Sequence, residues 1–192
     1  SGGVTDYVGN PLASDVTWSF TTEASPPPLL VVGSSSNPFG MYQTEILRNE
    51  GLDAFTTLDT SLLSSSVLSN FDVVLLGDTA LSGSQVTALT NWVNGGGKLI
   101  AMHPDKQLAT LLGLTDAAST LSNAYLKVDT TSGAGVGITG QTIQFHGSAD
   151  RYTLSGATAV ATLYSNATTA TTNPAVTLRS VGSSGGQAAA FT

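Results

Sequence analysis

Two short stretches of the sequence carry side chains that could perform acid–base chemistry. One holds His103 and Asp105, and the other, residues 145–152, holds His146 and Asp150. A histidine exchanges a proton near neutral pH, and a neighbouring carboxylate can orient its imidazole ring. His103 with Asp105, or His146 with Asp150, is therefore a candidate pair of general base and orienting acid.

Further polar residues are candidates for ligand binding. Arg151 and Tyr152 add hydrogen-bond donors and an aromatic face to the second stretch, which suits a sugar or another small polar ligand. Ser34, Ser35 and Asp78 each follow a predicted strand, where ligands bind in open α/β sheets. Each residue also has a structural interpretation: a helix cap or turn for the serines and Asp78, and an ion-paired turn for residues 145–152.

Composition argues against several other classes of protein. Cysteine is absent, so the chain has neither a thiolate nucleophile nor a disulfide framework. The sequence contains no phosphate-binding glycine motif with a lysine, and the spacing of its histidines and aspartates fits no metal motif, so we expect no cofactor and no metal. The net charge of −7 disfavours nucleic acid as a partner. No apolar run approaches the ~20 residues that cross a bilayer.

The surface composition indicates where the protein works. Only 10% of the residues are charged, so serine, threonine, glycine, asparagine and glutamine must cover most of the surface. Such a surface is common in secreted bacterial proteins. We therefore predict a secreted or cell-surface location.

The elements that must position these residues centre on residues 71–104. An apolar run at Val73 to Leu76 predicts a strand buried on both faces. A helix follows, capped by Ser82 or Ser84 and ended by three glycines at 95–97. A second buried strand runs from Leu99 to Met102. The helix buries one stripe of side chains, made of Val86, Leu89 and Val93. This order of elements predicts a right-handed βαβ unit.

The flanking sequence extends this unit into an α/β fold. We predict a flavodoxin-like open parallel sheet with strand order 2-1-3-4. The other elements of this sheet are strands at 29–33 and 53–57, a helix at 38–50 with Tyr42, Ile46 and Leu47 inward, a short helix at 62–68, and a helix between Asp105 and Gly113. After about residue 121 the hydrophobic pattern repeats every two residues, which predicts antiparallel strands attached to one edge of the parallel sheet. These strands lie at 125–128, 142–145, 152–154, 158–164, 175–179 and 187–191.

The N-terminal stretch predicts a separate unit. Residues 1–24 contain the pattern D-x-x-GN-x-L…W-x-F-T-T, which resembles the last two strands of a bacterial immunoglobulin-like domain. The alternative is a hairpin of the main domain. Residues 25–28 predict a stiff proline linker, and residues 29–192 form the main domain, which we expect to be truncated at its C-terminus. We expect the strand at Val16 to Phe20 to pair with a sheet edge of this chain or of a second copy.

A second resemblance covers residues 29–115. The pattern W-V-x-x-GGG-x-L-I-A-x-H, after a strand ending in Gly-Asp, resembles class I glutamine-amidotransferase-like domains, in particular the trehalose-utilisation (ThuA-like) branch. In that family the second strand delivers a cysteine nucleophile, whereas this chain has Met102 at that place. The resemblance therefore implies a non-catalytic, vestigial module of a secreted multidomain protein, with a structural or carbohydrate-binding role beside the other domains of its polypeptide. The alternative is a carbohydrate-active or other hydrolase that uses one of the two histidine–aspartate pairs.

Overall fold

The computed structural model describes residue 5 and residues 7–10, 17, 19, 28–37, 42–131 and 133–192. Most of the predicted immunoglobulin-like stretch and of the proline linker lies outside these residues. The predicted pairing of the strand at Val16 to Phe20 also lies outside them, so both predictions stay predictions.

In the described residues, nine strands form one mixed sheet in the order β2-β1-β3-β4-β11-β10-β9-β6-β7. The strands are β1 (Leu29–Gly33), β2 (Phe55–Asp59), β3 (Val73–Leu76), β4 (Lys98–Met102), β6 (Tyr125–Val128), β7 (Ile143–Gln144), β9 (Thr158–Tyr164), β10 (Ala170–Val181) and β11 (Gly186–Phe191). The pairs from β2 through β1, β3 and β4 to β11 are parallel, and the pairs from β11 through β10, β9 and β6 to β7 are antiparallel. The predicted α/β class is confirmed, and β2, β1, β3 and β4 are neighbours in the predicted order, but the sheet continues beyond β4, so the flavodoxin-like open sheet is not confirmed.

The last strand corrects one expectation. Strand β11 was predicted as antiparallel, but it lies parallel to β4 in the middle of the sheet, with Phe191 opposite Met102. A period of two indicates a strand and leaves its direction open. Ala188 and Ala190 are buried against the main core, which is the environment expected of a central strand.

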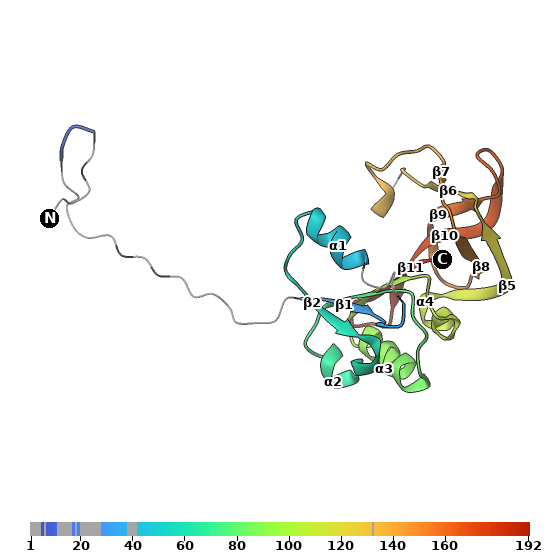
Figure 1. Cartoon of the computed structure of the whole chain (residues 1–192), viewed down its shortest axis with the longest axis horizontal. Helices are drawn as coiled ribbons and strands as arrows, with labels where there is room; N and C mark the ends of the chain where they lie inside the picture. Colours follow the sequence, from blue (N-terminus) through green and yellow to red (C-terminus); the bar gives the residue numbers. More distant parts are fainter. Residues whose placement is uncertain are drawn as a thin grey trace.

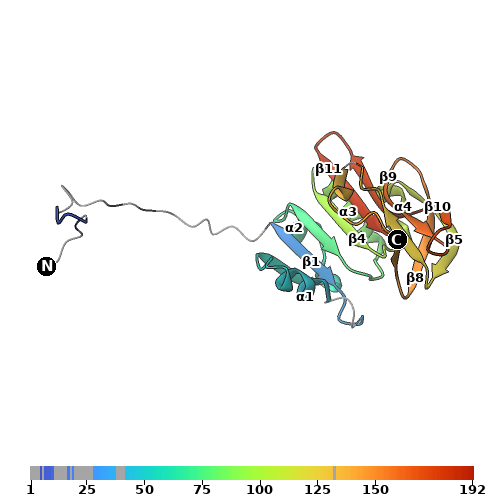
Figure 2. The ribbon, with the colours of Figure 1, turned by 90° about the horizontal axis from the view of Figure 1, so that it is seen from above.

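A further strand pair was only partly predicted. Strands β5 (Leu114–Ser122) and β8 (Ser148–Leu154) form a separate two-stranded antiparallel sheet. Figure 2 places this pair at the opposite end of the domain from β1. Strand β5 begins directly after Gly113, whose left-handed φ of 68° ends the preceding helix.

The helices lie on both faces of the sheet. Helices α2 (Ser65–Leu68) and α3 (Gly83–Asn94) lie on one face, and α1 (Tyr42–Asn49) lies on the other, as Figure 1 shows. Helix α4 (Ala109–Leu112) contacts β5, β10 and β11. The remaining short helices are η2 (Thr60–Leu62), η3 (Lys106–Leu108) and η4 (Gly133–Gly135).

Helix α3 matches its sequence pattern closely. Ser82 caps it through a capping box with Gln85. Leu89 and Val93 are fully buried in the main core, and Val86 packs against it. Helix α1 differs from the expectation, because Tyr42 and Ile46 are exposed and Thr44 is buried. Leu47, the third residue predicted to face inward, is half-buried and lies one turn from Thr44, so the prediction was wrong for Tyr42 and Ile46 only.

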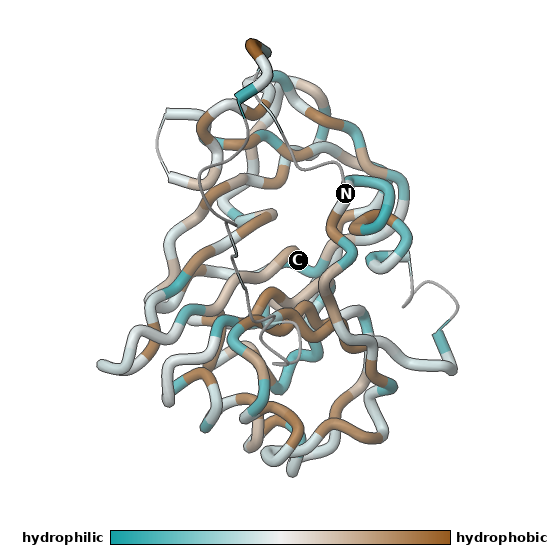
Figure 3. The backbone as a smooth tube through the Cα atoms, turned by 90° about the vertical axis from the view of Figure 1, so that its left-hand side faces the viewer, coloured by the Kyte–Doolittle hydropathy of each residue, from teal (hydrophilic) through white to brown (hydrophobic). Residues whose placement is uncertain are grey.

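Two hydrophobic cores hold the elements together. The larger core packs β1, β3, β4 and β11 against α3 and α4, and the smaller one lies between β8, β9 and β10. Hydrophobic segments along these central elements are brown in Figure 3. Because β1, β2, β3 and β4 are parallel, their carboxyl ends share one edge of this packed sheet.

Candidate functional site

A row of charged side chains crosses the carboxyl edge of the parallel strands. Asp78 follows β3, His103 follows β4, and Asp150 lies in β8. The His103 Nδ1 atom is 3.4 Å from Asp78 Oδ2, and the His103 Nε2 atom is 3.6 Å from Asp150 Oδ2. One imidazole ring therefore lies between two carboxylates. We call Asp78, His103, Lys106, Asp116 and Asp150 the His103 cluster.

The backbone holds His103 in an unusual conformation. Its φ is 45°, a left-handed value that few residues other than glycine adopt. The backbone N–H of His103 donates a 2.7 Å hydrogen bond to the Phe191 carbonyl of β11. Non-glycine residues in this region cost ~1–3 kcal/mol and concentrate at functional sites. The conformation is consistent with a ring that is positioned for contact with Asp78 and Asp150.

The two carboxylates beside His103 differ in their surroundings. The Asp150 side chain is only 10% exposed, whereas that of Asp78 is 57% exposed. Lys106 contacts the other oxygen of Asp150 at 3.5 Å and the Asp116 carboxylate at 3.1 Å. Asp150 is therefore fixed by two partners inside the protein, and Asp78 faces solvent.

Lys106 and Asp116 each stabilise the charged form of the other. The hydrogen bond to Asp116 is the main cause that raises the pKa of Lys106, and the Asp150 carboxylate adds to it. The backbone N–H of Ala118 and then Lys106 lower the pKa of Asp116. Lys106 therefore stays charged at neutral pH and places its positive charge beside Asp150.

Asp105 has a structural role that differs from the predicted one. Its carboxylate caps η3 by accepting from the backbone N–H of Gln107 at 2.9 Å, and it also accepts from the N–H of Leu81 at 2.8 Å. These bonds tie the loop after β4 to the loop before α3. The predicted partnership of His103 with Asp105 is thus replaced by pairs with Asp78 and Asp150.

Tyr152 and Arg151 do not reach the His103 cluster. Tyr152 is 1% exposed and belongs to the main core. Burial, with contributions from Asp150, Asp116 and Asp105, raises the pKa of its phenol to about 12. Arg151 donates to the Asn173 side chain at 2.8 Å. Arg151 is therefore bound to the chain itself and Tyr152 is buried, so neither offers the predicted polar face to a ligand.

The serines after β1 form a turn. The N–H of Ser35 donates to Asp59 at 2.8 Å, and the hydroxyl of Ser34 accepts from the N–H of Ser36 at 3.2 Å. Asn37, which the sequence analysis missed as a site residue, donates from its side chain to the Asp78 carbonyl at 2.9 Å. This bond links the turn to the carboxylate that faces solvent.

His146 lies away from Asp150, its predicted partner. The residue is exposed, and in the described part of the chain its imidazole has no ion pair, whereas Asp150 pairs with His103 and Lys106. His146 instead lines a cavity of about 250 Å³ together with Phe145 and Phe191. The structure thus separates the two predicted histidine–aspartate pairs and builds one cluster from members of both.

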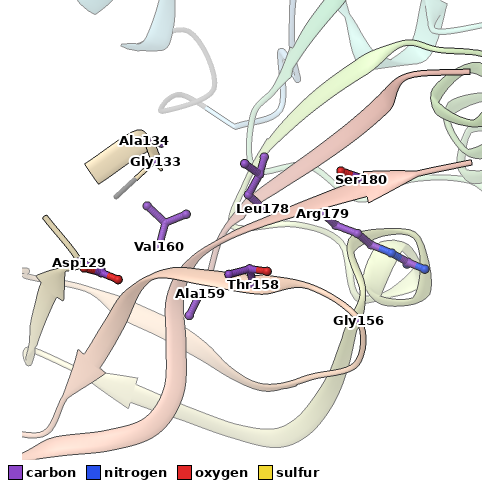
Figure 4. Close-up of a pocket in the computed structure, with 10 residues that line it drawn as sticks. All are labelled: Asp129, Gly133, Ala134, Gly156, Thr158, Ala159, Val160, Leu178, Arg179 and Ser180. Carbon is purple, nitrogen blue, oxygen red and sulfur yellow. The ribbon is translucent and has the colours of Figure 1, made fainter. Parts of the chain in front are cut away.

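A second cavity in the described part of the chain lies elsewhere. It measures about 460 Å³ and lies between η4 and strands β9 and β10. Figure 4 shows Asp129 and Arg179 at its two ends, with Val160 and Leu178 between them. Arg179 donates to the carbonyls of Thr110 and Leu111, and Asp129 accepts from Thr131. Since the chain itself satisfies both charged groups, we assign no chemistry to this cavity.

Among the described residues, no group of three or more histidine, cysteine, aspartate or glutamate side chains is arranged to hold a metal ion. Within that same part of the chain, every helix is too short or too polar to cross a membrane.

No protein-family model matches the sequence, and no curated protein matches it. Solved structures share the fold. A β-galactosidase from Bacillus circulans sp. alkalophilus has a TM-score of 0.67 at 11% identity, covering 87% of this chain and 28% of its own. An exo-β-1,4-mannosidase from Opitutaceae bacterium strain TAV5 has a TM-score of 0.59 at 16% identity, covering 87% and 31%. A cytoplasmic protein, STM1381 from Salmonella typhimurium LT2, has 0.63 at 10% identity, covering 85% and 86%.

These likenesses establish the fold alone, because every identity is below a fifth. The chain spans about 28% of the length of the β-galactosidase. They also contradict the amidotransferase-like resemblance, because the similar structures whose names state an activity are glycosidases. None of the similar structures named here is immunoglobulin-like, while the domain bounds at residues 1–24 stay a prediction. The inference of a vestigial amidotransferase module was therefore wrong. The predicted secretion has no support from these matches and stays a prediction.

The glycine-rich motif behind the amidotransferase resemblance has a local packing explanation. A Cβ atom on Gly97 would overlap the ring of Trp92, and one on Gly96 would lie 2.8 Å from the Ser184 carbonyl oxygen. Gly95 is the C-cap of α3. Trp92 in turn donates to the Phe71 carbonyl at 3.3 Å. The motif therefore specifies how a helix returns to its sheet and carries no chemistry of its own.

Lys106 and Asp116 are the members of the His103 cluster that the sequence analysis missed. Asp116 lies in β5, a strand that the periodicity did not predict. Lys106 follows Asp105 in a short helix and resembles any surface lysine in the sequence. The pairing of β5 with β8 places Asp116 opposite Tyr152, two residues from Asp150, and Lys106 of η3 contacts both carboxylates.

Proposed function

We propose that this chain is a carbohydrate-active hydrolase module in which His103 is the acid–base group. The observation that carries the proposal is the imidazole between a buried carboxylate and an exposed one at the carboxyl edge of the sheet. Ligands of open α/β sheets bind at this edge. The fold likeness to a β-galactosidase, a mannosidase and an α-L-fucosidase supports carbohydrate as the substrate class.

Asp150 is the orienting carboxylate in this proposal. It faces Nε2 of His103, it is nearly buried, and Lys106 fixes its second oxygen. A fixed anion at Nε2 selects the tautomer with its proton on that nitrogen. The Nδ1 atom is then free to accept a proton from a water molecule or a sugar hydroxyl, which is the task of a general base.

Asp78 is the carboxylate that faces the substrate. It is more than half exposed and lies on the Nδ1 side of the ring, where the proton transfer takes place. Glycoside hydrolysis develops positive charge on the sugar ring in its transition state, and an ionised carboxylate beside the ring stabilises that charge. Both nitrogen–oxygen distances exceed those of a normal hydrogen bond, so we expect them to shorten when substrate binds.

The test is a hydrolysis assay with nitrophenyl β-galactoside, β-mannoside and α-fucoside. We expect turnover of at least one substrate by the wild-type chain. The His103→Ala variant should lose ~10²–10⁴-fold in rate, the range of a general base. Asp78→Asn should also lose rate, because it removes the exposed charge.

Asp72→Asn is the matched control for Asp78→Asn. Asp72 precedes β3 and is exposed at the opposite edge of the sheet from Asp78, so this variant should keep the wild-type rate. Wild-type protein without activity on any of the three substrates would contradict the proposal. So would an active His103→Ala variant.

A further inference from the structure

A cavity of about 250 Å³ lies beside β8 and the end of β11. Phe145, His146 and Ser148 line one part of it, and Phe191 and Thr192 line another. Its volume is below the ~300–1,000 Å³ of sites for drug-sized ligands. It therefore suits a ligand no larger than one sugar ring.

Two links connect this cavity to the His103 cluster. The Phe191 carbonyl accepts the backbone hydrogen bond of His103. Ala149 lines the cavity and directly precedes Asp150 in β8. Successive strand residues point to opposite sides, so β8 presents Ala149 to the cavity and Asp150 to the imidazole. A ligand in the cavity would therefore be separated from the cluster by β8.

The chemistry of the lining fits a pyranose ring. The aromatic rings of Phe145 and Phe191 offer apolar faces for the C–H side of a sugar, since Phe191 is 39% exposed and Phe145 is half-buried. The imidazole of His146 is exposed and has no hydrogen-bond partner among the described residues, so it can bond sugar hydroxyls. The Ser148 hydroxyl, which is 3.3 Å from that of Ser122, adds a second polar group.

The turn that carries these groups is held in place by its own backbone. The N–H of Phe145 donates to the Ala124 carbonyl at 2.9 Å, and the N–H of Asn123 donates to the Gly147 carbonyl at 2.9 Å. Gly147 has a φ of 134°, which a side chain would disfavour. The pocket is therefore preformed, and binding does not have to order it.

We propose that this pocket is a subsite for a single pyranose ring of a carbohydrate substrate, on the other face of β8 from the His103 cluster. The subsite rests on the proposed hydrolase function for its role. Its binding can be measured without any reaction.

The experiment uses methyl β-galactoside and methyl β-mannoside as probes, titrated into the protein while the imidazole NMR signals are recorded. The chain has two histidines, so the His146 and His103 signals can be told apart with the His103→Ala variant. We expect one of the glycosides to shift the His146 signals. Phe191→Ala should weaken binding roughly tenfold through loss of an aromatic face. His146→Ala should weaken it roughly two- to tenfold, the range of one hydrogen bond.

Leu178→Ala is the matched control. Leu178 has the same 39% exposure as Phe191 and lies in the neighbouring strand, outside this pocket. Its variant should bind like the wild type, as should His103→Ala.

Failure of the subsite and failure of the hydrolase are distinguishable. Binding that His103→Ala abolishes and Phe191→Ala leaves unchanged overturns the subsite and keeps the hydrolase. Glycoside binding at His146 without turnover overturns the hydrolase alone, and no shift of His146 with either probe overturns the subsite.

Discussion

Replacing Tyr152 by phenylalanine should stabilise the protein. The Tyr152 hydroxyl is buried in the main core, and it has no hydrogen-bond partner among the described residues. A buried polar group without a partner costs about 1–3 kcal/mol. Tyr152→Phe removes that group and keeps the ring, so it leaves no large cavity. We expect the free energy of unfolding to rise by about 1–2 kcal/mol.

The gain should grow at alkaline pH. The phenol of Tyr152 has a pKa of about 12 in the folded protein, against 10.0 as its ordinary value. Above pH 10 the unfolded chain therefore loses this proton before the folded chain does, and wild-type stability falls as the pH rises. Phenylalanine has no proton to lose. The difference in stability between the two proteins should thus widen between pH 10 and 12.

Urea titrations followed by tryptophan fluorescence measure both effects. An increase of 1–2 kcal/mol raises the melting temperature by roughly 2–8 °C for a domain of this size. Tyr125→Phe is the control, because Tyr125 is partly exposed and its change should stay within about 0.5 kcal/mol. A less stable Tyr152→Phe protein would refute the reasoning, since it would mean that the hydroxyl is paired in solution, for example with an ordered water.

Three further predictions concern other parts of the fold. Gly97→Ala should cost about 1–3 kcal/mol by forcing the Trp92 ring to move, and an unchanged urea midpoint would contradict this. Asp59 has a pKa well below its ordinary value because the side chain and backbone of Ser61 donate to it. The stabilisation that Asp59 provides is present above about pH 4 and is lost as the pH falls. The free energy of unfolding of Asp59→Asn should therefore fall less than that of the wild type when the pH is lowered below about 4, and an equal fall would contradict this. His103→Ala should cost under about 1 kcal/mol because the side chain is 43% exposed, and a loss of several kcal/mol in urea would show that the ring is structural.

The parallel half of the fold could be predicted because its signals are local. The capping residue and apolar stripe of α3 lie within one segment, and a buried strand such as β3 is a short apolar run. The positions of β6 and β9 were predicted residue for residue, since their alternating pattern is bounded by turns. Strand β5 was missed because most of its residues are exposed or half-buried, so its hydrophobic pattern is weak.

The partners within the candidate site could not be predicted in the same way. Asp105 is two residues from His103, and proximity in sequence favoured that pair. The carboxylate instead caps η3, a short-range role that competes for the same side chain. Asp150 reaches the ring from 47 positions further along the chain, through the packing of β8 against the rest of the fold. A single sequence holds no signal for such a contact.

The place of β11 in the sheet affects the order in which the molecule can assemble. This strand follows every other described element in the sequence, yet it joins the parallel strands to the antiparallel ones. Until it is in place, β4 is an open edge that can pair with a neighbouring chain, and pairings this distant form slowly. The Phe191 carbonyl that binds the backbone of His103 belongs to the same strand. The pairing of β11 therefore closes the sheet and completes the site in one step. A chain that stops folding before this step has neither a closed sheet nor a complete site.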